Sequence, residues 1–177
     1  QGAARSSQPN QGQAVSADLL LLQQQPTLGD TGTRYDILID LECPYCHQFL
    51  SGAPYATILQ QAHDGQAQLN VTAAAFLNEK SVIKGSVYNC VAEASGPTAA
   101  LSLIPALKEA GGDTNYWYEH ALTLGAQHVD ADALQECVAD GSAQERANLA
   151  FRTSGANGVP TVFVDGLEVA WPHVQPN

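Results

Sequence analysis

Residues 41–48 read Leu41-Glu42-Cys43-Pro44-Tyr45-Cys46-His47-Gln48 and follow the apolar run Ile-Leu-Ile at 37–39, which is typical of a buried strand. Pro44 favours the first turn of a helix, where its fixed φ is already helical and its missing N–H is not needed. Cys43 is therefore predicted at the N-cap, where unpaired N–H groups and the helix dipole stabilise a thiolate. Cys46 lies one turn further on and can close a disulfide with Cys43. The pattern predicts a redox dithiol with Cys43 as nucleophile and Cys46 as resolving cysteine.

A zinc site is the alternative interpretation of a CxxC motif, but it needs two further ligands at suitable spacing. The other two cysteines, Cys90 and Cys137, are isolated, and no two of the five histidines lie three to five residues apart. A purely structural disulfide is also disfavoured, because a loop of two residues constrains little chain. We therefore expect no metal and no cofactor.

The composition restricts the kind of partner. The chain has 177 residues with 7 basic and 18 acidic side chains, a net charge of −11, which argues against binding nucleic acid or an anionic membrane surface. No apolar run approaches the length of a membrane span. The sequence contains no methionine and starts at Gln1, so we expect a mature form from which a signal peptide or anchor was removed.

Cys90 and Cys137 leave two alternatives open. They can be two inert buried thiols, since free cysteine is often buried. In an oxidising compartment a structural disulfide between them is favoured, and it would stabilise the fold by roughly 4 kcal/mol because it closes a long loop.

The periodicity along the chain predicts an α/β domain interrupted by helices. Residues 1–16 have the composition of a flexible tail, and residues 17–25 form a short helix or strand. Strands are predicted at residues 35–41, 68–76, 158–164 and 167–171, the last two joined by an Asp-Gly turn. Helices are predicted at residues 44–61 with a kink at Gly52 and Pro54, 88–94, 97–110 with an interruption at Pro105, 113–125, 130–141 and 142–154.

Two motifs together resemble the thioredoxin superfamily: the CPYC at 43–46 and the segment Gly-Val-Pro-Thr at 158–161. The resemblance implies that Pro160 has a cis peptide bond and lies against the two sulfurs. It also implies that the backbone of Val159 pairs with a substrate strand. A cis proline is uncommon and usually functional.

The long helical stretch between these motifs resembles the DsbA-like disulfide oxidoreductases, whose thioredoxin fold is split by an inserted all-helical domain. The segments CPYCHQF at 43–49, YWYEHAL at 116–122 and GVPTVFVDG at 158–166 agree with that family. The resemblance implies a thioredoxin-like domain at residues 17–80 and 142–177 and a helical insertion at residues 81–141.

The resemblance implies an exported thiol-disulfide oxidoreductase, most simply an oxidase that forms disulfides in secreted or envelope proteins through Cys43 and Cys46. It also implies an extracytoplasmic location, in the periplasm or cell envelope, either free or tethered to the membrane through the missing N-terminus. The partners of this enzyme would be reduced or misoxidised proteins and a membrane reoxidase, and the protein is expected to be a monomer. Two alternatives remain: a reductase or isomerase that uses the same CPYC site, and a non-catalytic peptide-binding module.

The chain departs from the family in three ways. Tyr45 stands where strong oxidants often have histidine, so Pro44 and Tyr45 are expected to give the cysteine pair a different reduction potential. His47 is either a further residue that tunes this potential or an exposed helix residue. The carboxylates of Asp40 and Glu42 would oppose a thiolate on Cys43 if they are close in space. The family's last helix is missing before Asn177, so either the Leu19 region covers that sheet face or the domain is built differently.

Overall fold

The computed structural model describes residues 19–176, so the expected tail at residues 1–16 lies outside the described residues. Within this range one mixed sheet has the strand order β2-β1-β3-β4. β1 and β2 run parallel, and β3 is antiparallel to both β1 and β4. The strands are β1 (Thr33–Ile39), β2 (Ala67–Ala73), β3 (Thr161–Val164) and β4 (Leu167–Val169).

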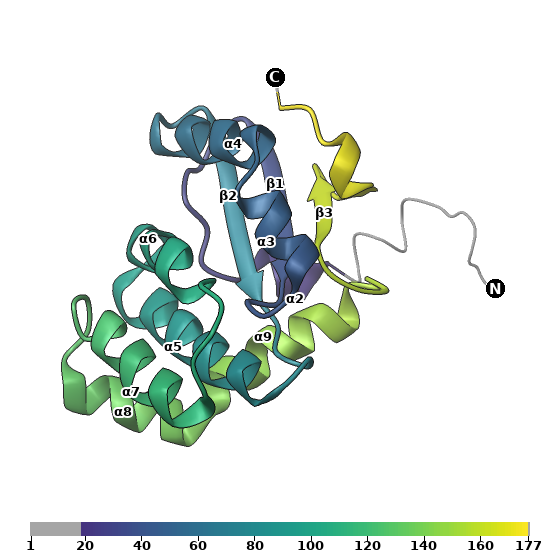
Figure 1. The fold of residues 1–177 in the computed structure, drawn as a ribbon. Coiled ribbons are helices and arrows are strands. Elements are labelled where there is room, and N and C mark those ends of the chain that lie inside the picture. Colours follow the sequence, from purple (N-terminus) through teal and green to yellow (C-terminus); the bar gives the residue numbers. More distant parts are fainter. Residues whose placement is uncertain (1–18, 177) are drawn as a thin grey trace.

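Helices surround this sheet and fill the long connection between β2 and β3. Figure 1 shows α5 to α8 gathered beside the sheet, whereas α3 and α4 lie along β1 and β2. The expected α/β fold with a helical insertion is therefore confirmed. The helices are α2 (Leu20–Gln23), α3 (Pro44–Leu50), α4 (Ala53–His63), α5 (Glu79–Ser95), α6 (Pro97–Leu107), α7 (Thr114–Gly125), α8 (Ala131–Asp140), α9 (Ser142–Thr153) and the 3₁₀ helix η1 (Trp171–His173).

The residue bounds of the two domains stay a prediction, because α9 touches both parts. Its Gln144 amide donates to the Ala73 carbonyl of β2 at 3.0 Å, and the Gln144 Oε1 accepts from Asn89 of α5 at 3.1 Å. α9 also packs against α2 on the sheet side. This helix therefore joins the helical cluster to the sheet.

Both faces of the sheet are covered, and alternate side chains of β1 point to opposite faces. One face carries Ile37 and Ile39, which share a core with Phe49 and Ile58 of α3 and α4. The opposite face carries Leu38, in a second cluster of buried residues whose other members are Leu19, Leu22, Ala150 and Phe163. The Leu19 region thus covers the face opposite to α3 and α4. The short helix η1 lies on the α3 side, and its Trp171 ring lies edge-on to Phe49.

A buried polar network fixes α2 to the sheet. Asp36 is fully buried in β1, and its carboxylate accepts two hydrogen bonds from the Arg34 guanidinium at 2.9 Å and one from the Asn70 amide at 2.9 Å. Arg34 also donates to the Gln23 carbonyl at 3.0 Å, and Asn70 to the Leu22 carbonyl at 2.9 Å. The ionised groups are therefore paired and oriented, which a buried charge requires.

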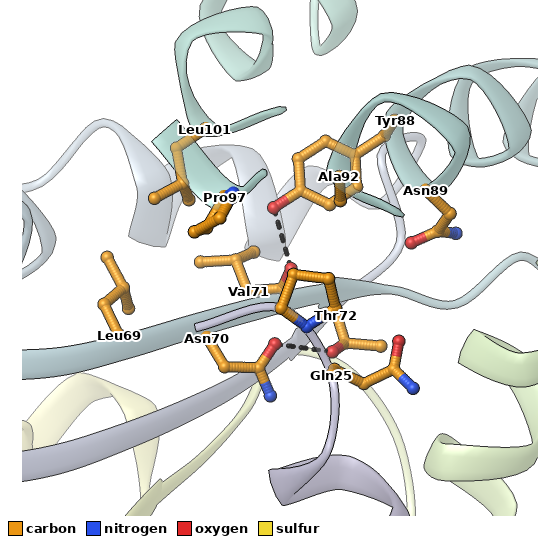
Figure 2. A pocket seen from close by; sticks show the side chains of 11 residues that line it. Gln25, Leu69, Asn70, Val71, Thr72, Tyr88, Asn89, Ala92, Pro97 and Leu101 are labelled. Atoms are coloured by element: carbon orange, nitrogen blue, oxygen red, sulfur yellow. Dashed lines mark hydrogen bonds between the residues drawn. The ribbon is translucent and has the colours of Figure 1, made fainter. Parts of the chain in front are cut away.

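The helical cluster meets the sheet at β2 (Figure 2). The Tyr88 hydroxyl of α5 donates to the Val71 carbonyl at 2.7 Å, and the Thr72 hydroxyl donates to Asn70 at 2.7 Å. The cavity among these side chains has a volume of about 10 Å³, far below that of a small-molecule site. This junction is a packing contact, not a ligand site.

Three predicted helices differ from the observed ones. The helix predicted at residues 88–94 is wrong in length: α5 begins at Glu79, because Asn78 and Ser81 cap its first turn reciprocally. The kinked helix at 44–61 is two helices, α3 and α4, with Gly52 in extended backbone between them. The interruption at Pro105 is also wrong: α6 runs from Pro97 to Leu107 with Pro105 inside it, and Pro105 removes only the one hydrogen bond that its own N–H would have donated to the Leu101 carbonyl.

β2 ends at Ala73, three residues earlier than predicted, because side chains capture the next backbone N–H groups. Asn148 accepts from Ala75, and Asp40 accepts from Phe76 and Leu77. The Asp-Gly turn is confirmed: Asp165 and Gly166 both have positive φ, 49° and 85°, as a tight hairpin turn needs.

We predict that Asp36→Ala lowers the free energy of unfolding by about 3 kcal/mol or more, because it leaves the Arg34 charge without its buried partner. Urea denaturation followed by circular dichroism would measure the loss. Glu145→Ala is the control, since its ion pair with Arg152 is exposed and is expected to contribute below about 1 kcal/mol. Equal losses in both variants would contradict the role given to Asp36.

Candidate active site

Cys43 occupies the N-cap of α3. Its backbone is extended, with φ −86° and ψ 122°, and Pro44 follows in the first turn. The Cys43 sulfur accepts a hydrogen bond from the Cys46 N–H at 3.3 Å. The sulfur therefore faces the positive end of the helix, the position at which a thiolate is stabilised.

Asp40 holds the turn that brings the chain from β1 to Cys43. Its fully buried carboxylate accepts hydrogen bonds from the backbone of Glu42, Phe76 and Leu77 and from the Ser81 hydroxyl, at 2.7–3.2 Å. The Asp40 carbonyl also accepts from the Cys43 N–H at 3.0 Å. One side chain thus ties together the turn before Cys43, the loop after β2 and the first turn of α5.

Cys46 lies beneath Cys43 and is fully buried. Burial is the main cause that raises the pKa of the Cys46 thiol far above its usual range; a backbone hydrogen bond with Asp40 opposes the shift, and the charges of Cys43 and Asp40 add to it. Cys46 therefore stays a protonated thiol at neutral pH. Cys43 is also largely buried, but it keeps an exposed fraction of 6%, whereas Cys46 has none.

The Val159–Pro160 peptide bond is cis, and this loop lies against the cysteines. The Cys43 thiol faces the Val159 carbonyl oxygen at 3.7 Å. Pro160 is buried and Val159 is half-buried. The fold therefore brings together the two motifs that lie far apart in the sequence.

Tyr45 and His47 have different surroundings. The Tyr45 ring is 63% exposed and lies 6.2 Å from the Trp171 ring, centroid to centroid. Both rings line an open groove of about 520 Å³ beside α3, together with Gln48, Phe49, Gly52, Pro54 and Pro172. The His47 ring instead hydrogen-bonds through Nε2 to the Leu41 carbonyl, so it braces the turn before Cys43.

Glu42 does not stand as a free charge beside Cys43. Its carboxylate is 2.6 Å from the ammonium of Lys84, a fully buried lysine on α5. Lys80 lies 3.7 Å from the other carboxylate oxygen. Although burial raises the pKa of Glu42, the hydrogen bond and charge of Lys84, helped by Asn78 and Lys80, lower it overall. Glu42 is thus held ionised and paired.

Sequence reasoning missed Lys84 and the structural role of Asp40. A signal for Lys84 was present, because it lies at helical spacing from Tyr88 and Val91, on the face of α5 that is buried. Lys84 was nevertheless not predicted to be buried, because lysine is almost never fully buried unless it is paired. Asp40 was noted only for its charge, although its place directly after a buried strand is a common position for a turn-fixing carboxylate.

Cys90 and Cys137 form a disulfide with an S–S distance of 2.04 Å, which joins α5 to α8. The bridge lies inside the helical cluster and leaves Cys43 and Cys46 as the free cysteines of the chain. Within residues 19–176 no three His, Cys, Asp or Glu side chains are placed to hold a metal ion. No helix in the same range has the length and apolar character of a membrane span.

A family model described as Thioredoxin matches residues 23–176. The chain belongs to the thioredoxin family. Within this thioredoxin-family fold, the CPYC at the start of α3 and the Val159–Pro160 loop occupy facing positions. No curated protein matches the sequence.

Several solved thiol-disulfide oxidoreductases share the fold of this chain. BdbD from Bacillus subtilis has 18% identity and a TM-score of 0.70, with 86% of this chain and 88% of that chain covered. The disulfide oxidoreductase DsbG from Mycobacterium tuberculosis has 18% identity and a TM-score of 0.71, covering 89% and 85%. DsbA from Chlamydia trachomatis has 17% identity and a TM-score of 0.66, covering 85% and 84%. At these identities the likeness is one of fold.

We predict that a brief pulse of iodoacetamide on the reduced protein modifies Cys43 and spares Cys46. Because burial raises the pKa of Cys46, its reactive thiolate is absent below that pKa, so the selectivity should persist from neutral pH to about pH 9. Peptide mass spectrometry would read the two sites separately. Comparable modification of both cysteines would contradict the burial of Cys46.

The Cys90–Cys137 bridge gives a second prediction. Replacing both cysteines by alanine should lower the free energy of unfolding by about 4 kcal/mol, because the bridge closes a loop of sequence separation 47 in the unfolded chain. The alkylation pattern of Cys43 and Cys46 should be unchanged, since the bridge lies in another part of the fold. A variant of unchanged stability would show that the bridge does not form in solution.

Proposed function

We propose that this protein is an exported thiol-disulfide oxidoreductase that forms disulfides in secreted or envelope proteins. The observation that carries the proposal is the Cys43 sulfur at the start of α3, with Cys46 buried beneath it and the Val159 carbonyl 3.7 Å away. The DsbA-like architecture supports disulfide chemistry on protein substrates. The Cys90–Cys137 bridge supports an oxidising, extracytoplasmic location, where such bonds persist.

The reaction begins with the Cys43–Cys46 disulfide. A substrate thiolate attacks the Cys43 sulfur, the Cys43–Cys46 bond breaks, and Cys46 leaves as a thiolate that takes up a proton. A second substrate thiolate then attacks the substrate sulfur of the mixed disulfide and releases Cys43. The substrate gains one disulfide and loses two electrons, and the protein is left as a dithiol.

The environment of each sulfur suits its step. Cys43 is the sulfur at the helix N-terminus, so it is both the site of attack and the better thiolate when it is released. Cys46 is shielded, so an external thiol cannot attack it directly. The raised pKa of Cys46 keeps it protonated once the mixed disulfide has formed, which delays its return to Cys43.

The Val159–Pro160 loop is proposed to bind the substrate chain. A substrate sulfur bonded to Cys43 has its own backbone close to Val159, so an extended segment can pair with the Val159 backbone while Pro160 lies against the sulfurs. Pro44 and Tyr45 set the local environment of the dithiol. His47 acts indirectly, through its contact with the turn at Leu41.

The Cys43–Cys46 disulfide must be re-formed after each turnover. By family resemblance the electron acceptor is a membrane reoxidase, and the protein acts as a monomer. The reverse direction, a reductase or isomerase, uses the same sulfurs with electrons supplied by another donor. A peptide-binding module without catalysis is the remaining alternative.

Cys43→Ser is expected to abolish oxidative refolding of a reduced, disulfide-containing protein, because no mixed disulfide can form. When Cys46→Ala is mixed with a disulfide-bonded substrate protein, the Cys43 thiolate is expected to attack the substrate disulfide and stay in a mixed disulfide, because no Cys46 thiol is present to release it. Non-reducing gels and mass spectrometry would detect the mixed disulfide. Retained refolding activity in Cys43→Ser would contradict the proposal. An absence of trapped substrate in Cys46→Ala would favour the non-catalytic peptide-binding module.

The reduction potential separates the two directions of electron flow. A value near about −120 to −180 mV, measured by equilibration with glutathione, would support an oxidase or folding catalyst. A value near about −270 mV would support a reductase and exclude the oxidase direction.

A further inference from the structure

Lys84 is a fully buried cation that the dithiol chemistry above does not use. Its ammonium donates to Glu42 Oε2 at 2.6 Å and to the Glu109 carbonyl at 2.9 Å, and it lies 3.9 Å from the centroid of the Trp117 ring. Trp117 is itself held by a hydrogen bond from its indole N–H to the Gly111 carbonyl at 2.6 Å. The Lys84 ammonium is therefore surrounded by the turn before α3, the segment after α6 and helix α7.

These contacts direct the Lys84 ammonium at Glu42. Burial is the main cause that lowers the pKa of Lys84 overall, helped by the charge of Lys80, whereas the hydrogen bond and charge of Glu42 oppose the shift. The face of the Trp117 ring attracts a cation, and the Glu109 carbonyl provides an acceptor. The ammonium thus keeps acceptors even when the charge of Glu42 is removed.

The partner of Lys84 is adjacent to the nucleophile in the chain. Glu42 directly precedes Cys43, and its N–H is fixed by Asp40 at 2.9 Å. A carboxylate next to a thiolate disfavours the thiolate unless a cation compensates for it. Replacing a buried ion pair by apolar side chains is often neutral or stabilising, so stability alone is a weak explanation for burying this one.

We propose that Lys84 is a positioning residue for the redox couple: it fixes and neutralises Glu42, so that a thiolate on Cys43 does not face an unpaired carboxylate. The inference rests on the proposed function of the Cys43–Cys46 pair. It assigns to the helical insertion a direct part in setting the redox equilibrium, because α5 supplies the compensating charge.

The equilibrium with glutathione reports this effect. Two glutathione thiols each give up one electron and join as glutathione disulfide, while the Cys43–Cys46 bond breaks and both cysteines are reduced. Any group that stabilises the Cys43 thiolate favours the reduced protein, and any group that destabilises it favours the disulfide.

Lys84→Met and Glu42→Gln should shift this equilibrium in opposite directions. Lys84→Met leaves the Glu42 charge unpaired and should favour the disulfide, whereas Glu42→Gln removes that charge and should favour the dithiol, each by about threefold or more. The double variant should return close to wild type. A purely structural contact would lower the stability of the variants without opposite changes in the equilibrium constant.

Lys80→Met is the graded control, because Lys80 is on the same helix but is more exposed and 3.7 Å from Glu42. Its shift should have the sign of Lys84→Met and be smaller. If Lys84→Met does not fold, Glu42→Gln alone decides, since it keeps the size of the side chain and an acceptor oxygen for Lys84. Alkylation with mass spectrometry would quantify the oxidised fraction in each case.

The outcomes separate this inference from the proposed function. If the wild-type protein does not equilibrate between a Cys43–Cys46 disulfide and a dithiol, the proposed function fails. If the wild type equilibrates and Glu42→Gln leaves the constant unchanged or favours the disulfide, the role of Lys84 is overturned. Shifts of the same sign in Lys84→Met and Glu42→Gln would overturn it as well.

Discussion

The arrangement of the active site depends on the buried carboxylate of Asp40. A single charge in a dry environment must be fully hydrogen-bonded, and here the donors come from the turn before Cys43, the loop after β2 and the first turn of α5. The same contacts end β2 and set the start of α3. Satisfying one buried carboxylate thus fixes where the nucleophile stands relative to the helical insertion.

The α/β order, the CPYC motif at 43–46 and the hairpin after the GVPT segment at 158–161 could be predicted because each carries a strong local signal. Pro44 after Cys43 marks a helix start, Asp165-Gly166 marks a hairpin, and the apolar run before the CPYC marks a buried strand. Each of these signals depends on residues that are neighbours in the sequence, so it can be recognised without knowing the tertiary contacts.

The contacts that connect separate elements could not be predicted. Lys84 and Glu42 lie far apart in the sequence and become neighbours only when α5 packs against the turn at Cys43. The early start of α5 depended on reciprocal hydrogen bonds between Asn78 and Ser81, a pairing that the usual serine-to-glutamate pattern does not describe. The end of β2 was set by side chains of Asp40 and Asn148, which override the alternating pattern of the strand.

The coexistence of a closed Cys90–Cys137 bridge and a free dithiol has a consequence for the maturation of the protein. Four cysteines can pair in three ways, and one of these leaves Cys43 and Cys46 available to each other. Either of the other pairings would bond both Cys43 and Cys46 to cysteines of the helical cluster. The newly made chain is therefore exposed to the same pairing errors as any protein that acquires disulfides. Only the pairing that joins α5 to α8 in the folded protein leaves Cys43 and Cys46 free to act together.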